Sequence, residues 1–184
     1  MKEIICVLDI ESSGLSHKKD CILELGMVSL NTKTGEIKPL FNHTFKEKHL
    51  TARHRTSWIF DNSDMTLEDI RESEDIEFYR EEIQGIFDKF KDNIVAYNRN
   101  FDADFLESRG FDLGEAMGDP MRISTDYFKL PSKNGRGFKW PKVTECFSAL
   151  FPDEEYEEAH RGYSDSEDEA RIIFELIKLG VYKG

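Results

Sequence analysis

Two carboxylates stand two positions apart at the end of an apolar stretch, residues 3–15, which reads EIICVLDIESSGL. Side chains alternate between the two faces of a strand, so Asp9 and Glu11 are expected to project from the same face. Two neighbouring negative charges repel each other unless a cation lies between them. Hard divalent metals such as Mg²⁺ bind carboxylate oxygens and keep positions for water and phosphate. The pair therefore predicts a cation site, with a solvated strand end as the alternative.

A second candidate acid follows a short apolar segment in residues 93–110, NIVAYNRNFDADFLESRG. Asn98 and its neighbours supply turn or N-cap chemistry, which places Asp102 in the first turn of an expected helix. Phe101 and Phe105, four positions apart, would anchor that helix on the core. An acid at this position also suits the helix dipole without any further function. Helical spacing alone does not rank Asp102 against Asp104.

The third stretch, residues 157–180, pairs a histidine with acids ahead of an amphipathic segment. A calcium-binding EF-hand loop starting at Asp165 is excluded, because Ala170 and Leu176 stand where glycine and glutamate are required. His160 and Asp165 are five positions apart, so on one continuous helix they would point about 140° away from each other. Both can face one site only if His160 lies in the loop and Asp165 in the first helical turn. The alternatives are a solvated acidic segment and a surface histidine.

Length and composition predict one domain, residues 1–184, with a substantial core, since 39% of the residues are hydrophobic. The chain has neither an apolar run of 18 residues nor the features of a signal peptide, so we expect a cytoplasmic protein without a membrane anchor. Cys6, Cys21 and Cys146 are odd in number and lack metal-binding spacing, as expected for reduced thiols.

The net charge of −12 argues against a protein that holds nucleic acid mainly by long-range attraction. It leaves nucleic acid open as a substrate, because bound metal ions would supply positive charge. Two basic segments, residues 46–55 and 129–142, are candidates for holding a strand, with solvated loops as the simpler interpretation.

The order of predicted elements indicates an α/β fold with a mixed sheet. Strands are expected over residues 3–15, 21–31 and 37–45, joined by short turns as an antiparallel meander. Further strands are predicted over 93–98 and 122–128, and helices over 66–73, 77–92, 100–110, 142–151 and 164–180. We therefore predict a five-stranded mixed sheet flanked by helices.

In this order, the three stretches resemble the signature of the DEDDh (DnaQ-like) 3′–5′ exonucleases, which have a ribonuclease H-like fold. The first motif, D-x-E followed by two hydroxyl residues, glycine and leucine, is matched by residues 9–15. The second, N-x-x-F-D, is matched by residues 98–102, and the third, H-x-x-x-x-D, by residues 160–165. The resemblance selects Asp102 over Asp104, and Asp165 over Asp168 and Glu169. One departure is the run Arg-Gly-Tyr-Ser between His160 and Asp165, where an Ala-Leu pair is common in the family, and we expect Gly162 to loosen the histidine loop.

The resemblance implies a two-metal phosphodiesterase that uses Mg²⁺ or Mn²⁺. Two such ions, roughly 4 Å apart, clamp the attacking and leaving oxygens of the phosphodiester. The implied metal ligands are Asp9, Glu11, Asp102 and Asp165, with Asp9 between the ions. The implied general base is His160, because a free histidine titrates near pH 6.5.

The same resemblance implies how a strand end is recognised. The residues implied to contact the terminal nucleotide are Ser12, Ser13, Leu15, Asn98 and Phe101, and Trp58 and Phe60 could extend an apolar surface on which bases stack. The expected substrate is the 3′ end of single-stranded nucleic acid, with DNA preferred over RNA. A polymerase or another replication or repair protein is a candidate partner. The alternatives are an oligoribonuclease and a noncatalytic acidic interaction module.

Overall fold

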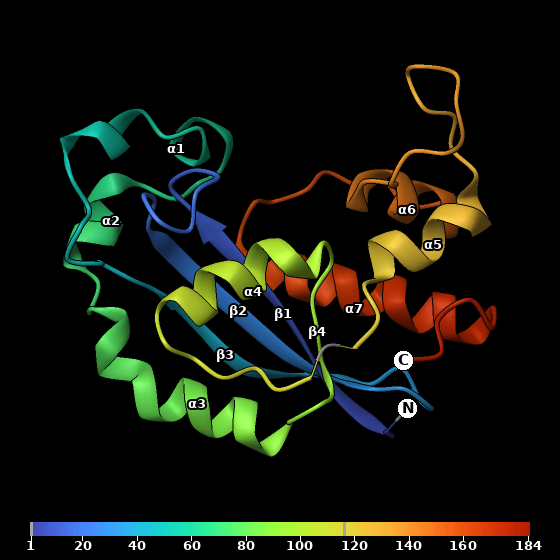
Figure 1. The fold of residues 1–184 in the computed structure, drawn as a ribbon, viewed down its shortest axis with the longest axis horizontal. Helices are drawn as coiled ribbons and strands as arrows, with labels where there is room; N and C mark the ends of the chain where they lie inside the picture. The colour runs from blue at the N-terminus through green and yellow to red at the C-terminus, as the bar shows by residue number, and fades with distance from the viewer. Residues whose placement is uncertain (1, 116) are drawn as a thin grey trace.

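The computed structural model describes residues 2–115 and 117–184. Four strands form one mixed sheet in the order β3-β2-β1-β4 (Figure 1). β1 (Ile4–Ser12), β2 (Ile22–Asn31) and β3 (Ile37–Thr44) form the predicted antiparallel meander. The short β4 (Ile94–Val95) pairs parallel to β1. This is the predicted ribonuclease H-like α/β arrangement, with one strand fewer than expected.

The helices lie in two stretches of the chain, one before β4 and one after it. Between β3 and β4 lie η1 (Ala52–Thr56), α1 (Ile59–Asn62), α2 (Leu67–Glu72), η2 (Ile76–Tyr79) and α3 (Arg80–Lys89). After β4 come α4 (Arg99–Ser108), α5 (Pro120–Phe128), α6 (Val143–Leu150) and α7 (Gly162–Lys178). The predicted helix over 77–92 is therefore divided into η2 and α3, and Phe78, in η2, is 71% exposed.

The predicted fifth strand was wrong, because residues 122–128 belong to α5. The Asp119 side chain accepts a hydrogen bond from the backbone N–H of Met121 at 2.9 Å, and Pro120 occupies the first helical position. An aspartate N-cap followed by proline is a strong helix start. Met121 and Ser124 are buried and Phe128 packs beside them, which is the spacing of one helix face rather than of a strand.

Alternate residues of β1 belong to two separate cores, one on each face of the sheet. Cys6, Leu8 and Ile10 pack in a core that includes residues of α3 and α4. Ile5 and Val7 pack in the other, with residues of α6 and α7. A strand that is buried on both faces needs a continuous apolar run, which explains the sequence of β1. Asp9 and Glu11 share the parity of Ile5 and Val7, and so face α7.

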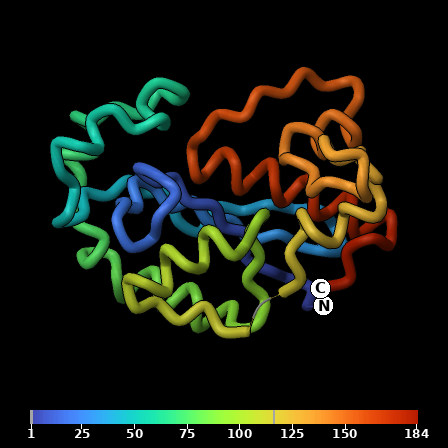
Figure 2. Tube along the Cα trace, turned by 45° about the horizontal axis from the view of Figure 1, so that its top comes forward, coloured from blue at the N-terminus to red at the C-terminus, as the bar shows by residue number. Residues whose placement is uncertain are grey.

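The end of β1 lies between two other segments of the chain. Figure 2 shows the segment around η1 and α1 on one side of it and the segment leading into α7 on the other. No helix in the described part of the chain is long and apolar enough to cross a membrane.

Candidate active site

The start of α7 lies directly on the sheet beside Asp9. Asp9 is opposite Gly26 in the β1–β2 register, and a Cβ atom at Gly26 would come within 2.1 Å of the Gly162 carbonyl carbon. Gly162 is equally restricted, since its own Cβ atom would lie 2.8 Å from the Gly26 nitrogen. The two glycines therefore permit close backbone contact, and Asp165 follows one turn later. The expectation that Gly162 loosens the histidine loop was wrong, because this residue is buried and tightly packed.

The first turn of α4 supplies Asp102, whose side chain is 2% exposed. Its Oδ1 accepts a hydrogen bond from the backbone N–H of Ile10 at 3.2 Å, which fixes the carboxylate beside β1. Asp104 lies on the outer side of the helix, with 59% of its side chain exposed and its carboxylate 3.8 Å from His17. As predicted, Phe101 and Phe105 anchor α4 on the core, with ring centroids 5.0 Å apart.

His160 lies in the loop before α7 and Asp165 in the first turn of the helix, the arrangement needed for both to face one site. The backbone of His160 is left-handed, with φ of 52°. Its imidazole meets the exposed ring of Trp58 edge to face, with centroids 4.7 Å apart. Ligand atoms of Glu11, His160 and Asp165 lie within 4.8 Å of one another.

These side chains meet in a cavity of about 490 Å³. Its lining includes seven of the residues named from the sequence: Asp9, Glu11, Asn98, Phe101, Asp102, His160 and Asp165. Three more of them, Ser12, Ser13 and Leu15, line an adjoining pocket of about 310 Å³ together with Trp58 and Phe101. Phe60 is half-buried instead and packs against the small core under α1 and α2.

The carboxylates of the cavity repel one another. Burial, followed by the charge of Glu169, holds the pKa of Asp9 well above its usual range. Burial and the charge of Asp165 raise the pKa of Glu11 to about 9. Burial also raises the pKa of Asp102 to about 8 and, with the charge of Glu158, that of Asp165 to about 7. Bound positive charge would relieve this repulsion.

The donor set fits a hard divalent cation. Carboxylate oxygens are the ligands that Mg²⁺ and Mn²⁺ prefer in proteins. Oδ1 of Asp165 is buried and has no hydrogen-bond partner among the described residues, so it is free to bind a cation. A buried carboxylate oxygen without a partner is costly, and a metal ion would satisfy it.

A comparison with known protein families shows the family of the chain. The RNase_T family model, described as Exonuclease, matches residues 6–173. The chain belongs to this exonuclease family. It is of the DEDDh type, with the three motifs on β1, α4 and the start of α7.

Solved structures share the fold of this DEDDh exonuclease. The nuclease domain of 3′hExo, a DEDDh family member bound to rAMP, has a TM-score of 0.67 at 17% identity, covering 97% of this chain and 94% of that one. E. coli Exonuclease I in complex with a dT13 oligonucleotide has a TM-score of 0.71 at 12% identity, covering 95% of this chain and 41% of that one.

Curated relatives are much longer proteins. DNA polymerase III PolC-type of Listeria welshimeri is 26% identical over 179 residues, which are 94% of this chain and 11% of the relative. The protein of the same name from Clostridium perfringens is 31% identical over 117 residues, 62% of this chain and 7% of the relative. The exonuclease chain therefore spans about a tenth of the length of the curated relatives it matches.

Sequence reasoning passed over two acids in the cavity of this exonuclease, Glu158 and Glu169, and the second is buried. Glu169 is 3% exposed and lines the cavity, where its Oε2 accepts a hydrogen bond from the backbone N–H of Tyr97 at 3.2 Å. It lies four residues after Asp165, and therefore on the same face of α7. Asp168 points elsewhere and lies 3.7 Å from Arg171. The four-residue spacing was the signal that could have identified Glu169.

A further overlooked group holds the histidine loop. Glu24 on β2 is buried and pairs with Arg161, the residue that follows His160. The backbone N–H of Arg161 donates to Oδ2 of Asp165 at 3.1 Å, and the Asp165 N–H donates back to the Arg161 carbonyl at 2.9 Å. This exchange links the loop to the first turn of α7.

Proposed function

We propose that the chain is one metal-dependent 3′–5′ exonuclease domain, residues 1–184, acting in the cytoplasm. It would remove nucleoside monophosphates from the 3′ end of single-stranded nucleic acid, with DNA preferred over RNA. The observation that carries this proposal is the convergence of Asp9, Glu11, Asp102, Asp165 and His160 in one cavity.

In this proposal the four carboxylates hold two divalent ions, Mg²⁺ or Mn²⁺. When bound, such ions neutralise charge on the phosphate and stabilise the attacking and leaving oxygens. Asp9 is central to this set, because the charges of Glu169, Asp102, Glu11 and Asp165 all act on it. Asp102 is positioned by its hydrogen bond from Ile10, and Asp165 has a buried oxygen without a hydrogen-bond partner among the described residues.

His160 is the proposed general base. It is half-buried at the rim of the cavity, on the same side as Glu11 and Asp165, so it can reach both the site and solvent. A neutral imidazole there would take the proton of the attacking water and release it to solvent. The Trp58 ring restricts how the imidazole can turn.

The pocket beside the carboxylates is the proposed seat of the terminal nucleotide. Leu15 is 88% exposed and Trp58 is 58% exposed, so both can contact a base. The hydroxyl of Ser12 donates to the Gly14 carbonyl at 2.7 Å, and that of Ser13 accepts from the Cys21 N–H at 2.8 Å. Both serines thus shape the turn that forms the pocket wall. Phe101 lines both this pocket and the catalytic cavity, whereas Asn98 lines the catalytic cavity.

The similarity to PolC-type DNA polymerases supports DNA as the substrate and a polymerase as the partner. RNA is the second candidate, because 3′hExo, one of the structures of the same fold, is bound to rAMP. Rates on matched DNA and RNA oligonucleotides, short and long, distinguish these two and test the oligoribonuclease alternative.

The deciding experiment uses single strands labelled at the 5′ end, with Mg²⁺ or Mn²⁺. We expect a ladder that shortens one nucleotide at a time from the 3′ end and is abolished by EDTA. Asp9→Ala should remove the activity, whereas Asp104→Ala, on the outer side of α4, should retain it. Activity that survives both EDTA and Asp9→Ala would show that it does not come from this site, and an inactive wild type would favour the noncatalytic module.

A further inference from the structure

A separate cavity, of about 650 Å³, lies outside both the catalytic cavity and the adjoining nucleotide pocket, and its lining is basic and neutral. These residues are His17, Lys18, Lys19, His49, Thr51, Arg53, Ser108 and Arg109, which we call the basic pocket. Among the described residues no acidic one lines it, although the chain has a net charge of −12. Such a concentration of positive charge on an acidic protein indicates an anionic ligand.

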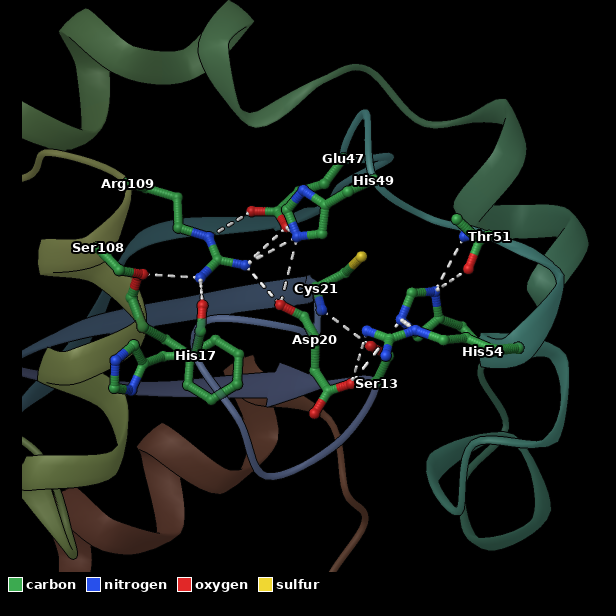
Figure 3. Close-up of polar contacts among 12 residues, drawn as sticks. Ser13, His17, Asp20, Cys21, Glu47, His49, Thr51, His54, Ser108 and Arg109 are labelled. Atoms are coloured by element: carbon green, nitrogen blue, oxygen red, sulfur yellow. Dashed lines mark hydrogen bonds and ion pairs between the residues drawn. The ribbon is translucent and has the colours of Figure 1, made fainter.

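Arg109 builds the wall of the basic pocket. Its guanidinium makes two hydrogen bonds of 2.8 Å to the buried carboxylate of Glu47, and it donates to the backbone carbonyls of His17 and Asp20 at 2.6 Å (Figure 3). This arrangement ties the end of α4 to the loop between β1 and β2. Because Glu47 neutralises its charge, Arg109 has mainly a positioning role.

Further positive charge in the pocket comes from three other residues. Lys18 and Lys19 are exposed, and no ion pair of either is found among the residues that the structure describes. Arg53 forms an ion pair with Asp20 at 3.4 Å and donates to Nε2 of His54 at 3.0 Å, with 52% of its side chain exposed. The two lysines are therefore available to an incoming anion, and Arg53 can add a contact through its exposed part.

Cys21, Glu47 and His49 also come close enough to hold a metal ion. The Arg109 guanidinium already occupies this place, since it is bonded to Glu47 and lies 3.3 Å from Nε2 of His49. A second cation would be repelled, so the group favours an anion-binding wall over a metal centre.

The basic pocket is connected to the catalytic cavity by two elements. Phe101 at the start of α4 lines the catalytic cavity, and Ser108 at its end lines the basic pocket. Ser108 follows Phe101 by seven residues, and at about 1.5 Å per helical residue this separates the two sites by roughly 10 Å along the helix. The β1–β2 loop also joins them, since Ser12 lines the nucleotide pocket and Lys18 the basic one.

We propose that the basic pocket binds backbone phosphates of the substrate strand, roughly three nucleotides upstream of its 3′ end. The estimate comes from a spacing of roughly 3.4 Å per nucleotide along a stacked strand. This inference rests on the proposed exonuclease function and adds where the rest of the strand lies. Contacts to phosphates position a strand independently of its sequence, as expected for an enzyme that shortens any 3′ end.

The test compares substrates that can and cannot reach the basic pocket. A triple variant, Lys18→Ala with Lys19→Ala and Arg53→Ala, is assayed on a 12-nucleotide strand, a dinucleotide and the p-nitrophenyl ester of thymidine 5′-monophosphate. We expect KM for the 12-mer to rise roughly tenfold, and the slope of log affinity against log salt to become shallower by roughly two. The two short substrates should be hydrolysed as by the wild type.

The matched control removes three lysines, Lys2, Lys38 and Lys89, which line a cavity at the opposite end of β1. It changes net charge equally and should leave KM for the 12-mer unchanged. An unchanged KM in the triple variant, or an equal rise in the control, would overturn the inference. The double variant Lys18→Ala/Lys19→Ala, which keeps the contacts of Arg53, should show a smaller effect in the same direction.

Binding without catalysis separates this inference from the proposed function. Fluorescence anisotropy of a labelled 12-mer in EDTA measures binding without hydrolysis, and the difference between the wild type and the triple variant reports the contribution of the basic pocket. If the wild type binds more tightly than the triple variant but hydrolyses no substrate with added metal, the pocket is supported and the exonuclease proposal fails. If the ester is hydrolysed and both proteins bind the 12-mer equally, the exonuclease proposal stands and the pocket fails.

Discussion

Arg161 and Glu24 form an ion pair that joins the histidine loop to β2. Nη2 of Arg161 lies 2.8 Å from Oε1 of Glu24, and Nε lies 3.0 Å from Oε2. Glu24 also accepts a hydrogen bond from the backbone N–H of Gly162 at 3.0 Å. Glu24 is opposite Glu11 in the sheet register. Its side chain therefore holds the loop that carries His160 in a fixed place relative to Asp9 and Glu11.

Glu24→Gln should therefore reduce catalysis by displacing His160. The amide retains one acceptor but loses the bidentate charge-assisted pair, and we expect kcat to fall roughly 10- to 100-fold, as for other groups that orient a functional side chain. The His160 imidazole signals in an NMR spectrum should shift. The control is Asp64→Asn, which removes the other, 77%-exposed partner of Arg161 and should change kcat little. Equal effects of the two variants would contradict this role of Glu24.

Replacing His160 itself should affect the chemical step more than metal binding. Loss of a general base typically costs roughly 10²- to 10⁴-fold in rate, so His160→Ala should lower kcat by that factor. Calorimetric titration with Mn²⁺ should give a similar affinity to the wild type. His43→Ala, an exposed histidine on β3, is the control. If the variant retains wild-type kcat when chemistry is rate-limiting, His160 is not the base.

The local parts of this site could be predicted because they depend on short-range periodicity. Alternation along β1 places Asp9 and Glu11 on one face, and the helical angle between His160 and Asp165 requires a loop before α7. The pattern around residues 122–128 misled because its apolar residues suit a strand, while the Asp119–Pro120 helix start lies outside the segment.

The remaining parts depend on tertiary contacts. Glu24 looks like an ordinary strand residue until Arg161, 137 positions away, pairs with it. Gly162 resembles a flexible residue in the sequence, and only the opposing Gly26 shows that it is a packing position. Glu169 had a local signal, but its burial follows from how α7 lies on the sheet.

Without metal, the protein should lose stability as pH rises. Folding raises the pKa of Asp165 to about 7, of Asp102 to about 8 and of Glu11 to about 9. The folded state then holds protons that the unfolded state has released, so this contribution is complete below about pH 4 and disappears through pH 9. In EDTA, Tm should fall across this range, and Mg²⁺ or Mn²⁺ should restore it at high pH. A Tm in EDTA that rises from pH 5 to pH 9 would contradict the carboxylate repulsion.

Glu169→Gln should separate stability from metal binding. The amide oxygen can still accept the hydrogen bond from Tyr97, whereas the negative charge that acts on Asp9 is removed. We therefore expect a higher Tm in EDTA at pH 8 and a several-fold weaker affinity for Mn²⁺. Glu167→Gln, whose side chain accepts a hydrogen bond from the Tyr163 hydroxyl, is the control on the same helix. A lower Tm in EDTA for Glu169→Gln would contradict this prediction, because it would show that the charge of Glu169 does not destabilise the metal-free site.

Gly26→Ala tests the close contact that brings α7 to the sheet. The added methyl group would meet backbone atoms of Gly162 and Tyr163 at 2.1–2.2 Å, and backbone cannot move aside as a flexible side chain can. Overpacking of this kind costs about 1–3 kcal/mol or more, and it should also move Asp165 away from Asp9. We expect a lower free energy of unfolding in urea and weaker Mn²⁺ binding.

Gly85→Ala is the control, because a Cβ atom there meets nothing within 4 Å and Gly85 is inside α3. It should stabilise the protein by about 0.5–1 kcal/mol, so that the same substitution gives opposite signs at the two glycines. If Gly26→Ala were neutral, the α7–sheet contact would have to be looser than the structure shows.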